Sequence, residues 1–143
     1  DETLLPYTAR FGSGCAMELG GQPGTGPCEY PATVLDHVVP GVPAYSEELF
    51  GPVASIIRAS DEADAIRIAN DTAFGLAASI WTEDRAKGEA LARKIQAGAV
   101  FVNALVRSDV RLPFGGTKTS GFGRELAEHG IHEFMNIKTV YVD

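Results

Sequence analysis

The sequence predicts an α/β domain in which parallel strands alternate with crossover helices. Between residues 53 and 102, apolar runs rich in β-branched side chains alternate with two stretches of helical periodicity. Capping residues and glycines stand where these helices would begin and end. A strand–helix–strand–helix–strand order implies parallel strands joined by right-handed crossovers.

The first part of the chain is predicted to be extended and interrupted by turns. Residues 1–13 are weakly patterned and form no helical stripe. A short strand is predicted over residues 15–19, and extended chain over residues 31–35. Pro40 and Pro43 then favour a non-helical approach to the next apolar run.

A buried strand over residues 53–58 and a helix after it form the first unit of the alternation. Ser60 is the predicted N-cap of this helix, because a serine hydroxyl can accept a hydrogen bond from the first turn. Gly75 is the predicted stop, and the next strand is predicted over residues 76–81.

The second helix is predicted to begin after Thr82 and to end at Gly98. A third strand follows over residues 99–102. The apolar residues of the helix recur at helical spacing and predict one buried stripe, made of Ala86, Ala90, Leu91 and Ile95.

The end of the chain is predicted to hold a short helix over residues 124–129, which Gly130 stops, and a strand over residues 137–142. No linker composition interrupts residues 14–143, so they are predicted to form one domain.

Composition limits the classes of partner. The chain has 143 residues, 45% of them hydrophobic and 22% charged, as in a folded domain. Its net charge of −7 disfavours nucleic acid or an anionic membrane surface as a partner. Neither a membrane-length apolar run nor a signal peptide is visible, which favours a cytoplasmic protein. Cys15 and Cys28 lack metal-ligand spacing, so no metal site is predicted.

Residues 112–125 form the most distinctive stretch, with four glycines and two phenylalanines. The glycines permit backbone angles and close approaches that other side chains would block. Pro113 fixes the approach to Phe114. We interpret this stretch as an ordered loop that presents the Phe114 ring.

Three motifs in this order resemble the NAD(P)-dependent aldehyde dehydrogenases: EELFGP at residues 47–52, NDTAFGL at 70–76 and PFGGTKTSGFGRE at 113–125. Residues 101–103 and 129–140 are most similar to the succinate-semialdehyde dehydrogenases within that family. Because these enzymes are several times longer, the resemblance implies the C-terminal part of a catalytic domain.

The resemblance also implies a fold and partners. It implies a parallel, three-layer sheet with crossover helices, and a final strand, residues 137–142, that pairs across a subunit boundary in a homo-oligomer. The family oxidises a small-molecule aldehyde through a thiohemiacetal, and hydride passes to NAD or NADP. The choice between the two cofactors stays open, because no segment that reads the adenosine ribose is recognised.

Glu48 and Phe50 are the predicted cofactor-binding residues. By resemblance they are the family's cofactor-contacting pair. Their neighbours Leu49 and Pro52 are apolar, so the carboxylate stands in a context unlike ordinary acidic surface, which is the alternative interpretation. A carboxylate there can accept hydrogen bonds from two ribose hydroxyls, and an aromatic ring can lie against nicotinamide or ribose.

Ser108 and Phe114 are the predicted substrate-binding residues. The resemblance makes Phe114 a wall of the aldehyde channel; the alternative is a core aromatic. In succinate-semialdehyde dehydrogenases a serine at the place of Ser108 binds the substrate carboxylate, and Arg107 or Arg111 can add positive charge. The alternative for this stretch is an exposed polar loop.

No catalytic residue is assigned. The reaction needs a thiolate nucleophile and a general base. Cys15 and Glu18 do not match the resembled family, in which the base precedes the cysteine and both lie far upstream of the cofactor motif, and Cys28 has no matching context. His129 and His132 are interpreted as surface residues. The alternative function for the chain is therefore a non-catalytic assembly module that keeps the fold and the oligomer contacts.

Overall fold

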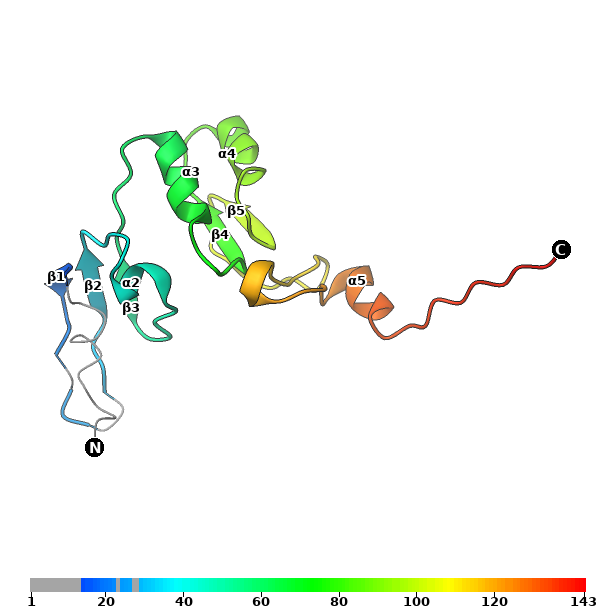
Figure 1. Ribbon diagram of the computed structural model, residues 1–143, viewed down its shortest axis with the longest axis horizontal. Helices are drawn as coiled ribbons and strands as arrows, with labels where there is room; N and C mark the ends of the chain where they lie inside the picture. Colours follow the sequence, from blue (N-terminus) through cyan, green and yellow to red (C-terminus); the bar gives the residue numbers. More distant parts are fainter. Residues whose placement is uncertain (1–13, 23, 27–28) are drawn as a thin grey trace. The chain divides into compact units, whose positions relative to one another are not determined.

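The computed structural model describes residues 14–22, 24–26 and 29–143 (Figure 1). The chain divides into two compact units, residues 1–68 and residues 69–143, and each is described by itself. The prediction made for residues 1–13 lies outside the described residues.

The first unit contains a three-stranded sheet in the order β1-β2-β3. β1 runs antiparallel to β2, whereas β2 and β3 are parallel, with Val34 opposite Ala54. The predicted strands are confirmed, and the third is shorter than expected. Their bounds are Ala16–Leu19 for β1, Thr33–Asp36 for β2 and Val53–Ser55 for β3.

The core of the first unit is formed by β2 and the chain that follows it. Leu35, Val38 and Ala44 are buried and form its centre. The Asp36 carboxylate is also buried, and the Arg58 guanidinium pairs with it. The backbone N–H of His37 and the Arg58 guanidinium hold the pKa of the Asp36 carboxyl below its usual range.

A short helix, α2 (Pro43–Ser46), lies where the prolines predicted non-helical chain. That prediction was wrong because Pro43 occupies the first helical position. A proline there loses no hydrogen bond, and its fixed φ suits the helix. The Glu47 N–H donates to the Pro43 carbonyl at 2.8 Å and ends the helix just before Glu48.

Helix α3 (Glu62–Asn70) is capped by Asp61 rather than by the predicted cap, Ser60. The Asp61 carboxylate accepts a hydrogen bond from the Asp64 N–H at 2.8 Å. The Asp64 carboxylate in turn accepts hydrogen bonds from the N–H and the hydroxyl of Ser60. Ser60 therefore lies one residue before the N-cap, and its hydrogen bonds to Asp64 stabilise the first turn of the helix.

The same helix ends at Asn70, before the predicted stop at Gly75. The Asn70 side chain donates to the Lys94 carbonyl at 2.9 Å and accepts from the Gln96 N–H at 2.8 Å. These tertiary hydrogen bonds give the chain a reason to leave the helix that local sequence does not carry.

The second unit contains two parallel strands, β4 (Ala77–Ile80) and β5 (Ala99–Val102), joined by the predicted helix, α4 (Arg85–Ala92). The helix ends before the predicted stop at Gly98, and of its predicted buried stripe only Leu91 is buried, whereas Ala86 and Ala90 are exposed. Asp84 caps α4 in place of Thr82, since its carboxylate accepts the Lys87 N–H at 3.0 Å.

An asparagine extends the ladder between these strands. The Asn103 side chain accepts the Thr82 N–H at 2.8 Å and donates to the Thr82 carbonyl at 2.7 Å. Asn103 has a left-handed backbone, with φ of 54°, a conformation that asparagine tolerates. Its amide therefore joins the two strand ends after their backbone pairing stops.

The last helix, α5 (Ala127–His132), begins later than predicted and contains Gly130. Glu125 is held in a bridge with Phe114, so the chain is not free to turn helical there. The following residues, 137–142, form no strand among the residues described and run as an exposed tail (Figure 1). A strand needs a partner, so the oligomerisation strand stays a prediction.

One short element completes the second unit. A 3₁₀ turn, η2 (Lys118–Ser120), follows the first glycines of the distinctive stretch.

Within the described part of the chain, the helices are all too short or too polar to cross a bilayer.

Candidate cofactor- and substrate-binding residues

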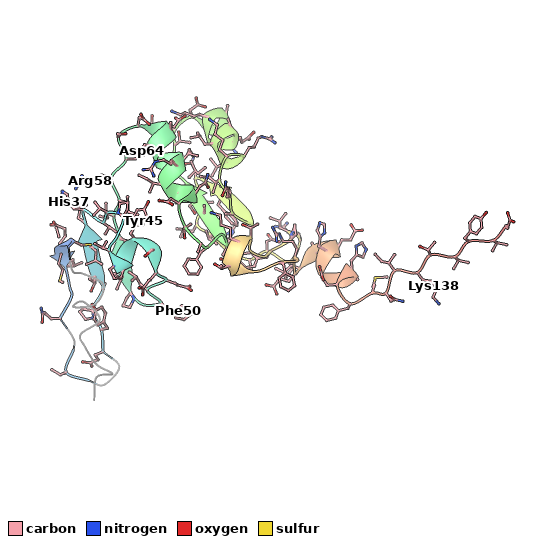
Figure 2. All side chains as sticks on the ribbon, viewed as in Figure 1. His37, Tyr45, Phe50, Arg58, Asp64 and Lys138 are labelled. Carbon is pink, nitrogen blue, oxygen red and sulfur yellow. The ribbon has the colours of Figure 1, made fainter. Side chains whose placement is uncertain are left out.

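The predicted cofactor pair flanks an anchored leucine. Leu49 is half-buried and packs against the core of the first unit. Glu48 and Phe50, on either side, are exposed, and 91% of Phe50 is accessible. Figure 2 shows the Phe50 ring projecting from the segment after α2. The packing of Leu49 holds the segment in place, and both predicted cofactor-contacting side chains stay exposed on either side of it.

Phe50 adopts a backbone conformation that is unusual for an aromatic residue. Its φ is 46°, in the left-handed region that costs free energy for residues with a Cβ. Such conformations persist where the surroundings determine them, and they cluster at ligand sites. The anchored Leu49 and the following Gly51-Pro52 are the surroundings that do so here.

The acceptor oxygens of Glu48 and the aromatic ring of Phe50 fit a nucleotide ribose and its base. Among the residues described, no hydrogen bond or ion pair engages the Glu48 carboxylate, so its oxygens are available as acceptors. The exposed Phe50 ring offers an apolar face next to them. Carboxylate oxygens accept hydroxyl hydrogen bonds strongly because the acceptor is charged.

The glycine loop of the second unit, residues 114–125, is closed at its base. The Phe114 N–H donates to the Glu125 carbonyl at 2.9 Å, and the Glu125 N–H donates back to the Phe114 carbonyl at 2.8 Å. The Arg124 guanidinium donates to the Gly116 carbonyl at 2.8 Å inside the loop. The predicted ordered loop is therefore observed, with Phe114 at its entry.

An open hollow of about 780 Å³ lies beside this loop, between it and α5. Phe114 is half-buried at the hollow, neither a core residue nor a free ring. The side chains around it are largely apolar, among them Leu76, Phe122, Leu126, Ile131 and Phe134. An apolar wall suits the carbon chain of an aldehyde and disfavours water.

Two glycines let the loop approach the sheet. A Cβ on Gly98, just before β5, would lie 1.6 Å from the Gly115 carbonyl oxygen. A Cβ on Gly75 would lie 2.5 Å from Oγ1 of Thr117. These close contacts place the first residues of the glycine loop against the residues just before β4 and β5.

Ser108 lies on an exposed loop that an ion pair braces. Arg111 donates from Nε and Nη2 to the Asp109 carboxylate at 2.9 and 2.6 Å. These hydrogen bonds lower the pKa of Asp109 to about 2, so the carboxylate stays ionised at any ordinary pH. Arg111 is thus committed to Asp109, whereas Arg107 is exposed and has no hydrogen bond among the residues described.

Of the rejected catalytic candidates, the structure describes Cys15 and Glu18. Cys15 is half-buried and packs against the core of the first unit. Glu18 is exposed on β1, and Gly20-Gly21 form the turn after that strand, both with positive φ. Cys28 lies outside the described residues.

A set of contacts that the sequence did not reveal holds the glycine loop. The Lys118 ammonium donates to the Asn70 carbonyl at 2.8 Å and to the Thr72 carbonyl at 3.0 Å. Its partners are 48 and 46 residues away in the sequence. The one signal of these contacts in the sequence is a lysine within a glycine-rich motif.

These features define an α/β protein with a parallel sheet and a glycine loop seated at its edge, and comparison with known proteins gives its class. Residues 7–140 match the model of the aldehyde dehydrogenase family. The chain belongs to that family.

Similar proteins carry related names. The chain is 50% identical to succinate-semialdehyde dehydrogenase [NADP(+)] 1 of Mycobacterium ulcerans and 47% identical to succinate semialdehyde dehydrogenase [NAD(P)+] Sad of Escherichia coli. The alignments cover 99% and 100% of this chain, and 31% of each relative. A crystal structure of a NAD-dependent aldehyde dehydrogenase from Sinorhizobium meliloti has a TM-score of 0.89 at 35% identity, over 95% of this chain and 28% of that one. The chain thus spans about a third of the length of its relatives.

Proposed function

We propose that this chain forms the C-terminal part of the catalytic domain of an aldehyde dehydrogenase that uses NAD or NADP to oxidise succinate semialdehyde or a similar acid aldehyde. The identity of 50% and 47% to two enzymes named for that substrate carries the proposal. Their names include NADP(+) and NAD(P)+, so both cofactors are kept.

Each predicted site residue has a role in this proposal. Glu48 binds the ribose hydroxyls next to the nicotinamide, and Phe50 supports the ring; the nicotinamide, when bound, accepts the hydride. Phe114 forms an apolar wall for the aldehyde chain. Ser108 donates its hydroxyl to the substrate carboxylate from the braced loop. Ser108 is exposed, and the neighbouring Asp109 carboxylate accepts the Arg111 N–H and so orders the loop. Both observations support this role, because a pre-ordered donor loses less conformational entropy on binding.

Replacing Ser108 tests the substrate. In a complete enzyme that carries this segment, Ser108→Ala is expected to lower kcat/KM for succinate semialdehyde about tenfold or more, because one hydrogen bond to a charged group contributes about 1.5 kcal/mol or more. With butanal, which has no carboxylate, kcat/KM is expected to stay within about twofold. Steady-state kinetics with both aldehydes measures the ratio.

Thr119→Val is a suitable control, because it removes an exposed hydroxyl that already donates to the Ala73 carbonyl. It is expected to leave the preference between the two aldehydes unchanged. An unchanged preference after Ser108→Ala would refute the carboxylate contact.

The purified 143 residues are expected to show no turnover by themselves. Cys15 packs at a core and Cys28 has no matching context, so we assign no nucleophile to this chain. The measurement is NADH or NADPH formation from succinate semialdehyde at high protein concentration. Turnover above a heat-inactivated control would overturn the assignment and establish an enzyme within these residues.

We also propose that residues 137–142 pair with another subunit in a homo-oligomer. The tail is exposed and extended, and its β-branched side chains favour a strand once a partner edge is present. The cytoplasm is the compartment that we propose for the assembled enzyme.

A further inference from the structure

Lys118 has an unusual backbone conformation, and its side chain donates two hydrogen bonds. Its φ is 55°, in the left-handed region that residues with a Cβ rarely adopt. Its ammonium donates to two backbone carbonyls, those of Asn70 and Thr72. A strained residue persists only where its surroundings determine it, so these two contacts are the reason to look for a role.

The Asn70 carbonyl is the last of helix α3, and the Thr72 carbonyl belongs to the bend that follows it. The last carbonyls of a helix have no partner within the helix, and the end carries a partial negative charge. The Lys118 ammonium therefore caps α3 from a distant part of the sequence. A cation with several donors suits this position in both charge and hydrogen bonding.

The contact extends through residues 117–120, here called the strap. The Thr119 N–H donates to the Ala73 carbonyl at 3.0 Å, and the Thr117 N–H donates to the Gly75 carbonyl at 2.9 Å. The Gly75 N–H donates to the Ser120 hydroxyl at 2.9 Å. In Figure 1 the strap is the gold turn at the base of β4, where the chain that leaves α3 arrives.

The strap is also the middle of the glycine loop. Gly116 is buried beside it, where a Cβ would lie 2.5 Å from the Ser120 side chain. Phe114 stands only two peptide units before Gly116, at the closed base of the loop. A shift of the strap away from α3 therefore moves the backbone that presents the Phe114 ring.

We propose that Lys118 is a positioning residue for aldehyde binding, which acts by capping α3 and so holds the strap and Phe114 in place. This inference rests on the proposed function, in which Phe114 is a wall for the aldehyde. Lys118 itself is exposed, and among the described residues the hydrogen bonds of its ammonium go to backbone carbonyls, so we infer that it acts through Phe114 and not on the substrate.

The test uses a complete enzyme that carries this segment. Lys118→Met keeps the length of the side chain and removes the donors. It is expected to raise KM for the aldehyde about fivefold, while KM for the cofactor and kcat change by less than about twofold, because a misplaced wall weakens substrate binding. Lys118→Arg keeps a cation with donors and is expected to restore KM to within about twofold of the parent. Lys87→Met, on α4, is the matched control and is expected to change none of these.

The outcomes separate this inference from the proposed function. Phe114→Ala is measured in parallel: if it leaves the aldehyde KM unchanged, the channel role of Phe114 is wrong, and the inference falls with it. If Phe114→Ala raises the aldehyde KM but Lys118→Met only lowers the melting temperature, Lys118 is merely structural and the inference alone is overturned. If Lys118→Met does not fold, Thr119→Val, which removes one strap hydrogen bond, is expected to raise the aldehyde KM about twofold for both aldehydes, and no change would overturn the inference.

Discussion

Gly98→Ala is expected to destabilise the second unit by about 3 kcal/mol or more, the upper range for forced overpacking. The added Cβ would lie 1.6 Å from the Gly115 carbonyl oxygen and 2.7 Å from its carbonyl carbon. Both atoms are backbone, so no rotamer change can relieve the clash. Either the start of β5 or the glycine loop has to move. Urea unfolding of a complete enzyme carrying the segment, followed by circular dichroism, measures the loss.

Gly130→Ala is the matched control for that prediction. Its Cβ would lie 3.2 Å from the nearest atom, and the residue is inside helix α5, where alanine is favoured over glycine by about 1 kcal/mol. We therefore expect a change in stability of less than about 1 kcal/mol. Equal losses for the two variants would mean that the contact between Gly98 and the glycine loop does not exist.

Glu48→Ala, in the same complete enzyme, is expected to raise KM for the nicotinamide cofactor about 10- to 100-fold. A hydrogen bond to a charged group contributes about 1.5–3 kcal/mol, and each 1.4 kcal/mol is about a factor of ten. Glu48 is exposed, and none of the hydrogen bonds in the described residues uses its carboxylate. The free energy of unfolding is therefore expected to change by less than about 0.5 kcal/mol. Kinetics at varied cofactor concentration and a melting curve check the two expectations.

Glu47 supplies the comparison, since it is an adjacent exposed carboxylate on the same segment. Glu47→Ala is expected to leave the cofactor KM within about twofold of the parent. A parallel loss of melting temperature and activity in Glu48→Ala would assign that residue to folding. A cofactor KM that rises equally in both variants would refute a specific contact between Glu48 and the cofactor.

The strands and crossover helices could be predicted because their signals are local. β4 and β5 are apolar runs, and each helix begins next to an acidic or hydroxyl residue. The caps were displaced by one or two positions, since Ser60 and Asp61 are both competent and only geometry selects the carboxylate. The helix after Pro43 was missed because proline at a first helical position looks like proline as a breaker.

The candidate site divides in the same way. The motifs located the cofactor segment and the glycine loop, and the structure gives Glu48 and Phe50 exposed positions and Phe114 a place at a hollow. The roles of these residues remain predictions. The Lys118 contacts were out of reach, because hydrogen bonds across 46 to 48 residues leave no periodic trace in a sequence.

The asparagine that joins the ends of β4 and β5 has an evolutionary consequence. Because the Asn103 amide, and not the chain beyond it, completes the pairing with Thr82, the sheet ends at a fixed point whatever follows. Changes in the stretch that carries Ser108 are therefore expected to leave the pairing of β4 with β5 intact. One such anchor would allow a lineage to explore new aldehydes by altering a few downstream positions.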